Sequence, residues 1–367
     1  PREIVHYMCQ ESLINYLHNH SDLPMEQLTN FIKNKSLENI ENSASKIDKL
    51  LANVKICDPA VGSGAFMLGM LNEIVNARLQ LDKILLKNSK EYDLKLHAIS
   101  NSIYGVDLDS GAVEIAKLRL WLALVVEEEI PFALPNLDHK IMQGNSLLEE
   151  YEGIKLFDDE IFINHETNKN EINLSQNRIV KFQSDKINIL QNTDFLNSAT
   201  KNEIKKIDKK INLLQQKVKN FNQNQIENNV DLFANNDQST KFEELRKSLT
   251  HKIKIYLQEN QKSKKENLKV EIDDLKFELI SASLKKNNQL NKLSEIKFLR
   301  QKNIRPFFIW KLEFCDVFSS ENPGFDIVIG NPPYIGEKGN KEIIRPIAQG
   351  NLKVYYQGKM DIFYFFF

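Results

Sequence analysis

Four consecutive residues, Asn331-Pro332-Pro333-Tyr334, could activate an aromatic amine. They follow directly after FDIVIG, an apolar run that reads as a β-strand. Two successive prolines fix the backbone, and neither offers an amide hydrogen. The Asn331 side-chain oxygen and the Pro332 carbonyl could each accept a hydrogen from an amino group, which favours a pyramidal nitrogen whose lone pair points at a methyl donor. Tyr334 would stack on a base, a contact worth roughly 1–3 kcal/mol. Taken alone, the four residues could also be a turn that only ends a strand.

A second group of residues could bind a ligand at the end of another strand. The run VKICDPAV (54–61) leads to Gly62-Ser63-Gly64, and a helical stretch, AFMLGMLNEIVNARL, follows. Glycines at this place let a ligand approach the backbone and the start of the helix. No Gly-Lys-Ser/Thr follows, so the loop is not a P-loop, and Met67 stands where G-x-G-x-x-G has its third glycine. Asp58 suits a ligand with an ammonium group, such as S-adenosylmethionine, although a lone G-x-G can equally be a plain tight turn.

The segment SIYGVDLD (102–109) carries a third candidate site residue. An acidic residue at the end of the second strand can bind both ribose hydroxyls of a nucleoside, and Asp107 is placed to do so. Asp109 is expected to cap the helix that follows. The alternative that Asp107 is also only a helix cap stays open.

These segments require an α/β fold. Strand patterns at 54–61, 102–109, HKIMQGNS (139–146) and FDIVIGNPPY (325–334) alternate with helical patterns such as 112–126. This alternation predicts a doubly wound, mostly parallel sheet, whose ligand crevice lies at the carboxyl ends of the strands. All three groups of candidate residues lie at those ends.

We expect four parts along the chain. Residues 1–50 read as a helical cap, 51–150 as the cofactor-binding half, 151–305 as a long helical insertion, and 306–367 as the half with the Asn-Pro-Pro-Tyr turn, cut off at its end. The insertion is rich in Lys, Asn, Gln and Glu. Three apolar series in it have helical spacing, and the first steps like the seam of a coiled coil. The three series are Ile204, Ile207, Ile211, Leu214, Val218 and Phe221; Leu245, Leu249, Ile253 and Tyr256; and Leu268, Ile272, Leu275 and Leu279.

Composition narrows the class of protein. The 367 residues carry a formal charge of -1, so contact with DNA must come from local clusters of Lys and Arg. Two such clusters occur at 201–221 and 285–302, and each could equally be a solvated helix surface.

No apolar run approaches the length of a membrane span. Three scattered cysteines argue against disulfides and zinc and favour a reducing cytoplasm, and His97 and His139 read as surface or capping residues. The sequence starts with Pro1 and stops at YFFF, so we expect a longer chain.

The motifs DPAVGSGAF, GVDLD, QGNSL and NPPY, in this order, resemble those of the gamma-class amino-group DNA methyltransferases. The stretches AKLRLWLAL (116–124), PNLDHKIMQGNSLL (135–148) and RPFFIWKLEFCDVF (305–318) look like the methylase region of type IIG single-chain restriction-modification enzymes. The resemblance covers residues 1–150 and 305–367. It implies the class I fold of S-adenosylmethionine-dependent methyltransferases and the methylation of adenine in DNA at its exocyclic amino group.

The resemblance also implies roles for single residues. Asp58, Pro59 and the loop from Ala60 through Gly62 to Gly64 would face the methionine part of S-adenosylmethionine. Asp107 would bind the ribose, Leu108 would pack on the adenine ring, and Asn145 would meet the adenine amino group of the cofactor. Pro1 would complete a further cofactor-contacting element. Asn331, Pro332, Pro333 and Tyr334 would hold the target adenine, flipped out of double-stranded DNA, and Lys359 and Asp361 would support the site. No metal is needed.

Several rival functions remain open. Methylation of the cytosine amino group uses a similar turn, and protein glutamine methyltransferases also carry NPPY, although without so long an insertion. A coiled-coil scaffold is the non-enzymatic alternative. A target-recognition domain is expected after residue 367 and a nuclease domain, if one exists, before Pro1. We expect a bacterial-type cytoplasmic protein that associates with the nucleoid when it binds DNA.

Overall fold

The computed structural model describes residues 2–126, 134–158, 232–259, 261–302, 304–320 and 322–366. By their contacts the residues divide into two compact units. The first comprises 1–157 and 246–367, and the second comprises 158–245. Pro1 and the coiled-coil seam expected at 201–221 lie outside the described residues. The first unit holds every other candidate site residue.

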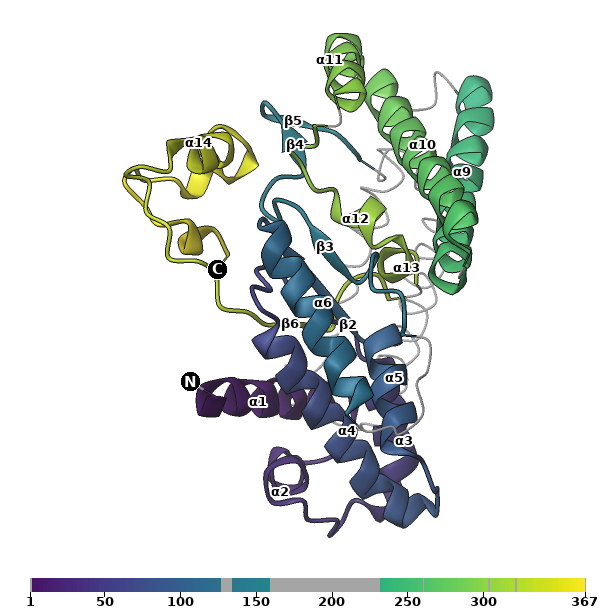
Figure 1. The fold of residues 1–367 in the computed structure, drawn as a ribbon, viewed down its shortest axis with the longest axis vertical. Helices are drawn as coiled ribbons and strands as arrows, with labels where there is room; N and C mark the ends of the chain where they lie inside the picture. Colours follow the sequence, from purple (N-terminus) through teal and green to yellow (C-terminus); the bar gives the residue numbers. More distant parts are fainter. Residues whose placement is uncertain are drawn as a thin grey trace, which may run out of the picture. The chain divides into compact units, whose positions relative to one another are not determined.

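A four-stranded parallel sheet forms the centre of the first unit (Figure 1). Its strands are β1 (Ile56–Asp58), β2 (Ile103–Asp107), β3 (Ile141–Gln143) and β6 (Ile327–Val328). The order across the sheet is β3-β2-β1-β6, and every neighbouring pair is parallel. The chain therefore winds outward from β1 through β2 to β3 and returns to the other side of β1 with β6. The carboxyl ends of β1 and β6 form the point where the winding direction changes, and open α/β sheets bind ligands at such points. The predicted parallel α/β sheet is confirmed.

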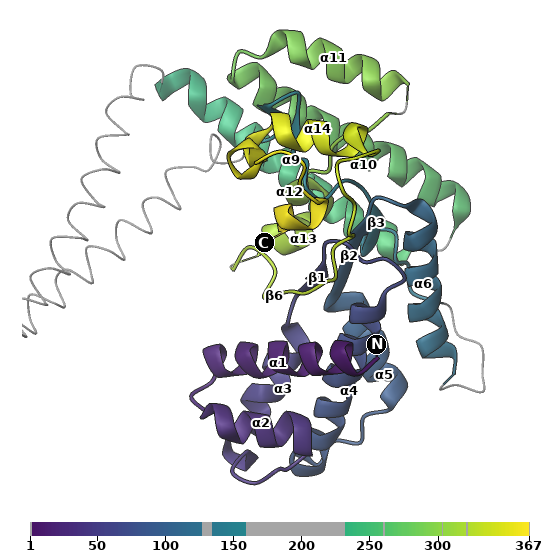
Figure 2. The ribbon, with the colours of Figure 1, turned by 90° about the vertical axis from the view of Figure 1, so that its left-hand side faces the viewer.

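Helices from the N-terminal part of the chain cover one face of the sheet (Figure 2). They are α1 (Arg2–His20), α2 (Met25–Asn34), η1 (Glu41–Ser43), α3 (Ala44–Asn53), α4 (Ala65–Leu85), α5 (Glu91–Asn101) and α6 (Ser110–Val125). Asp109 caps α6 as expected, because its carboxylate accepts a hydrogen bond from the Gly111 amide at 2.8 Å. A short antiparallel hairpin of β4 (Glu150–Tyr151) and β5 (Ile154–Lys155) follows β3. None of the described helices is both long enough and apolar enough to span a membrane.

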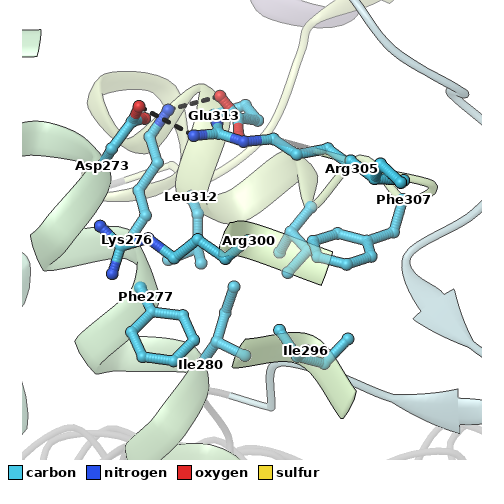
Figure 3. Close-up of a pocket in the computed structure, with 12 residues that line it drawn as sticks. Asp273, Lys276, Phe277, Ile280, Ile296, Arg300, Arg305, Phe307, Leu312 and Glu313 are labelled. Carbon is cyan, nitrogen blue, oxygen red and sulfur yellow. Dashed lines mark hydrogen bonds and ion pairs between the residues drawn. The ribbon is translucent and has the colours of Figure 1, made fainter. Parts of the chain in front are cut away.

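The later helices are α9 (Leu232–Gln258), α10 (Lys262–Lys286), α11 (Leu290–Gln301), α12 (Trp310–Glu313), α13 (Cys315–Phe318) and α14 (Lys341–Gln349), with short helices η4 (Asn351–Tyr355) and η5 (Ile362–Phe366). Ion pairs fasten α10 to the segment before the last strand. Arg305 pairs with Asp273 at 2.8 Å, and Lys276 pairs with Glu313. These pairs close one side of a small cavity of about 50 Å³, and Arg300 and apolar side chains form its other walls (Figure 3). This cavity is too small for a nucleotide and lies away from the strand ends.

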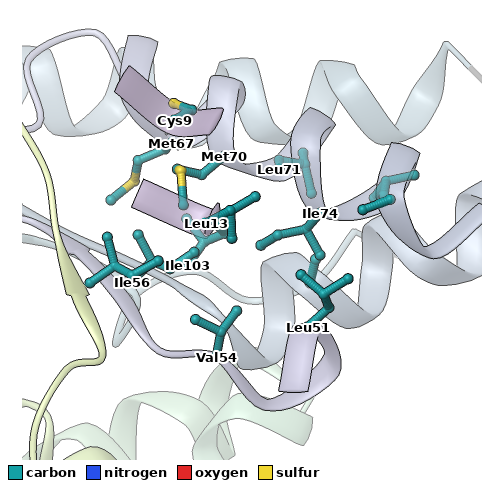
Figure 4. Close-up of a cluster of buried hydrophobic side chains, with 14 of the residues drawn as sticks. Cys9, Leu13, Leu51, Val54, Ile56, Met67, Met70, Leu71, Ile74 and Ile103 are labelled. Carbon is teal, nitrogen blue, oxygen red and sulfur yellow. The ribbon is translucent and has the colours of Figure 1, made fainter. Parts of the chain in front are cut away.

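Alternation along the strands explains why both faces of the sheet are covered, since successive side chains in a strand point to opposite faces. Ile56 and Ile103 join a large core with α1, α3 and α4 (Figure 4). Their neighbours Cys57 and Tyr104 belong to a separate core on the other face, with Phe314 and other residues of the 308–318 segment. The ring of Tyr104 meets that of Phe314 edge to face at 5.4 Å.

His139 differs from the expectation of a surface or capping residue. Its ring packs edge to face on Tyr256 of α9 at 5.2 Å, and its Nδ1 atom is buried without a hydrogen-bond partner. Burial, assisted by the charge of Lys276, lowers the pKa of His139 to about 3. The ring is therefore neutral at physiological pH.

Candidate active site

The loop after β1 is shaped by its own backbone hydrogen bonds. Asp58 is buried, and its Oδ1 atom accepts a hydrogen bond from the Ala60 amide at 3.0 Å. Gly64 has φ +80°, a conformation that favours glycine, and begins α4. A side chain on Gly64 would also come within 3.2 Å of Ala116. Gly64 therefore permits both the backbone conformation of the loop and its close packing against Ala116.

The glycine that is missing at Met67 is replaced by a glycine on the neighbouring strand. Met67 is buried, and a Cβ atom on Gly105 of β2 would lie only 2.5 Å from the Met67 Cε atom. Gly105 thus makes room for the larger helix residue. The close helix-to-strand packing that the third glycine gives in G-x-G-x-x-G sites is preserved by a different position.

Asp107 connects the loop to the end of β2. Its two carboxylate oxygens accept hydrogen bonds from the Gly62 amide at 2.7 Å and from the Asp109 amide at 2.9 Å. Each carboxylate oxygen can accept a further hydrogen bond. Burial, together with the charge of Asp107, raises the pKa of the Asp58 carboxyl to about 7.

A cavity of about 330 Å³ opens where these strands end, and we call it the strand-end cavity. Its size falls at the lower end of the range of about 300–1,000 Å³ that is typical of small-molecule sites. Its walls include most of the predicted cofactor-binding residues, namely Pro59, Ala60, Gly62, Asp107, Leu108 and Asn145. Asp58 and Gly64 are not among its lining residues. Asn145 also uses its side-chain oxygen to accept a hydrogen bond from the Leu147 amide at 3.2 Å.

A second cavity of about 510 Å³ lies beside the Asn-Pro-Pro-Tyr turn, and we call it the aromatic cavity. Pro332 and Tyr334 line it together with Phe66, Phe363 and residues of α1. The rings of Tyr334 and Phe363 lie 5.4 Å apart, and Tyr334 is 75% exposed. A flat apolar group can therefore reach the Tyr334 ring from solvent.

Asn331 is in the wall of both cavities, whereas Pro333 lines only the strand-end cavity. The Asn331 side chain is exposed and makes no hydrogen bond with any other residue that the structure describes. Its amide oxygen is thus available to a bound molecule. Within the described ranges, no three His, Cys, Asp or Glu side chains lie close enough together to hold a metal ion.

Lys359 and Asp361 lie behind the turn and line neither cavity. The Lys359 amide donates a hydrogen bond to Glu337 Oε2 at 2.7 Å, and Asp361 forms an isolated β-bridge with Gly336. These two contacts hold the segment that follows Tyr334 beside the segment that precedes Phe363.

Several lining residues were not predicted from the sequence. Ile335, Ile362 and Phe366 line the strand-end cavity, and Phe366 is the aromatic side chain among these lining residues. Ile4, Val5 and Met8 of α1 line the aromatic cavity. The aromatic run after Asp361 was a signal that pointed to Phe363 and Phe366, whereas nothing local pointed from α1 to a turn more than 300 residues later.

The fold and site together define an α/β protein with two adjoining cavities near the carboxyl ends of its strands. Residues 101–367 match the family described as Eco57I restriction-modification methylase. The match covers well over half of the chain, and the chain belongs to this family.

Curated relatives agree with the family. The chain is 27% identical to a putative type II restriction enzyme and methyltransferase, RM.MjaORFECS2P, of Methanocaldococcus jannaschii, over 99% of this chain and 29% of the relative. It is 31% identical to the type II restriction enzyme and methyltransferase RM.Eco57I of Escherichia coli, over 32% of this chain and 13% of the relative. It is 29% identical to DNA methyltransferase A of Bacillus subtilis, over 24% of this chain and 11% of the relative. The chain thus spans less than a third of the length of these relatives.

Proposed function

We propose that this protein transfers a methyl group from S-adenosylmethionine to the exocyclic amino group of adenine in DNA, in a restriction-modification or phage-defence system. The observation that carries the proposal is the position of Asn331 in the wall of both cavities. A methyl transfer needs its donor and its acceptor to meet at one point. Asn331 marks that point.

The strand-end cavity fits S-adenosylmethionine in shape and charge. Asp107 and Asp109 place two carboxylates at its edge, which suits a ligand that carries both a sulfonium and an ammonium group. Asp107 would accept the ribose hydroxyls, and the side chains of Leu108 and Phe366 would pack on the adenine ring. Asn145 would accept a hydrogen bond from the adenine amino group. Pro1, which the resemblance also assigns to the cofactor, adds to the proposal from sequence only.

When bound, S-adenosylmethionine supplies an electrophilic methyl group and a good leaving group. The residues of the chain have to align the acceptor. Asn331 Oδ1 and the Pro332 carbonyl would accept hydrogen bonds from the adenine amino group and turn the lone pair of its nitrogen toward the strand-end cavity. Alignment of this kind contributes about 7–11 kcal/mol in favourable intramolecular reactions.

The aromatic cavity fits a base that has left the DNA duplex. Enzymes that act on a base extrude it and read it between aromatic and apolar side chains. Tyr334 and Phe363 offer aromatic faces, and Ile4 and Met8 of α1 offer an apolar wall. Pro332 lines the same cavity as Tyr334, so stacking on the ring and hydrogen bonding to the Pro332 carbonyl would act on one base.

Product analysis tests the proposal. The full-length polypeptide is incubated with DNA and tritium-methyl S-adenosylmethionine, and the DNA is digested to nucleosides and analysed by mass spectrometry. We expect the label in N6-methyladenine. Label in N4-methylcytosine would overturn the assignment of adenine, and label in protein glutamine with none in DNA would overturn the assignment of DNA.

A further inference from the structure

Residues 337–360 form a lobe between the Asn-Pro-Pro-Tyr turn and the final aromatic segment, and we call them the basic lobe. The lobe contains α14 and η4 (Figure 1). Two backbone hydrogen bonds join the segment that enters the lobe to the segment that leaves it. The Ile362 amide donates to the Ile335 carbonyl at 2.9 Å, and the Glu337 amide donates to the Met360 carbonyl at 3.2 Å. The lobe is therefore joined to the rest of the unit by a pair of adjacent segments.

This junction lies beside the aromatic cavity. Tyr334 stands just before the departing segment and Phe363 just after the returning one, and both line the cavity. Their rings are 5.4 Å apart. A molecule that enters the aromatic cavity from solvent therefore lies next to this junction.

Contacts within the lobe and with neighbouring segments hold its backbone. Ile347 is fully buried in a small core with Leu148 and Ile362. Glu337 accepts hydrogen bonds from the Tyr356 hydroxyl at 2.8 Å and from the Lys359 amide at 2.7 Å, and these bonds hold the pKa of Glu337 below its usual value. The charged side chains of the lobe thus project from an ordered surface.

The charge of the lobe is strongly one-sided. It contains five basic residues against the two acidic residues Glu337 and Glu342, a net charge of +3. Because the whole chain carries -1, the remaining residues carry -4. All five basic side chains are exposed, and none pairs with an acidic side chain in the part of the chain that the structure describes; they are Lys338, Lys341, Arg345, Lys353 and Lys359.

The basic cluster that the sequence suggested at 285–302 is different. Lys292 pairs with Glu152 at 2.5 Å and with Glu295 at 2.7 Å, and Arg300 pairs with Asp274. Phosphates would have to compete with these carboxylates. The unpaired positive charge next to the aromatic cavity is therefore in the basic lobe.

We propose that the basic lobe binds the phosphates of the DNA strand that flank the extruded base. This inference rests on the proposed function and adds the surface that holds the DNA. Phosphate contacts fix the register of a protein on the duplex, and extrusion of a base costs a few kcal/mol that backbone contacts can offset. Lys341 and Arg345, four residues apart on α14, lie on the same side of the helix and can contact adjacent phosphates.

The salt dependence of DNA binding tests the proposal. The full-length polypeptide is titrated with a fluorescent mixed-sequence duplex over a range of salt concentrations. In the double variant Lys341→Gln/Arg345→Gln, the slope of log Kobs against log salt should become less negative by about 0.9 for each phosphate that the variant no longer neutralises. The same result is expected for Lys338→Gln/Lys353→Gln, whereas Lys341→Arg/Arg345→Lys, which keeps both charges, should keep the slope.

The matched control removes two positive charges far from the lobe. Lys49 in the middle of α3 and Lys83 in the last turn of α4 are exposed, and Lys49→Gln/Lys83→Gln should leave the slope unchanged. Equal slopes for wild type and both lobe variants would overturn the proposal, as would an equal change in the control. If the lobe variants change the slope but the wild type methylates no DNA, only the proposed function fails. If wild type methylates adenine and the lobe variants bind like wild type, only the lobe proposal fails.

Discussion

The two cavities that share Asn331 are built from different parts of the chain and by different chemistry. The strand-end cavity is lined largely by loops that follow β1, β2 and β3, and carboxylates and backbone amides shape its edge. The aromatic cavity is lined by rings and apolar side chains from α1, α4 and the segments around the turn. The first resembles a site for a charged nucleoside and the second a site for a flat base. Changes on either side should therefore affect one substrate and spare the other.

The largest effect is expected at the shared residue. Asn331→Ala removes the side-chain oxygen that we propose accepts a hydrogen bond from the target amino group, and methyl transfer by the full-length polypeptide should be abolished. Cofactor affinity, measured by calorimetry, should stay within a few-fold of wild type. Asn53→Ala, at an exposed asparagine on α3, is the control and should keep full activity. Near-normal turnover of Asn331→Ala in a tritium-methyl transfer assay would refute the role of Asn331.

A large effect limited to the cofactor is expected at Asp107. Asp107→Ala removes the acceptor for the ribose hydroxyls and leaves the Gly62 and Asp109 amides without their partner. Binding of S-adenosylmethionine should weaken at least tenfold, while binding of a duplex should change little. Unchanged cofactor affinity in calorimetry would remove Asp107 from the site.

A smaller effect limited to the acceptor is expected at Tyr334. Tyr334→Ala removes one stacking surface, but Phe363 remains beside the base, so the loss should be near the lower end of the range, roughly 1 kcal/mol. It should appear as a higher KM for DNA with an unchanged Kd for the cofactor. Tyr334→Phe keeps the ring and should restore the KM. If Tyr334→Phe were as impaired as Tyr334→Ala, stacking would not be the function of this residue.

The last effect concerns stability and not substrate binding, and it distinguishes the buried Asp58 from the exposed Asp109. Because burial raises the pKa of folded Asp58 from 3.8 to about 7, the folded state binds a proton that the unfolded state has lost between these values. Asp58 therefore lowers the free energy of unfolding as pH rises from about 4 to 7. Asp58→Asn should gain stability relative to wild type between pH 5 and pH 8, roughly 2–3 kcal/mol, because about two pH units of this window lie below the folded pKa.

Urea unfolding of both proteins at pH 5 and pH 8 measures this difference. Asp109→Asn is the matched control, because Asp109 is exposed and asparagine also caps helices well. A pH-independent difference for Asp58→Asn would show that the carboxyl does not titrate in this window.

Features that depend on neighbouring residues could be predicted from the sequence, whereas contacts between distant segments could not. The strands, the glycine loop and the cap at Asp109 were predicted correctly, because each depends on neighbours within a few residues. The wall formed by α1 and the burial of His139 under Tyr256 depend on residues more than 100 positions away. Likewise, the cluster at 285–302 looked like a basic surface, but two of its cations, Lys292 and Arg300, pair with Glu152 and Asp274. The boundaries of the insertion at 151 and 305, and its coiled-coil seam, remain predictions.

A crystal structure of the full-length polypeptide with S-adenosylhomocysteine and a DNA duplex tests the central claim most directly. The two-cavity account predicts the cofactor product in the strand-end cavity, with its ribose on Asp107. It also predicts an adenine in the aromatic cavity whose amino group donates hydrogen bonds to Asn331 Oδ1 and the Pro332 carbonyl. A cofactor product bound in the aromatic cavity, or an extruded base that does not contact Asn331, would contradict the account.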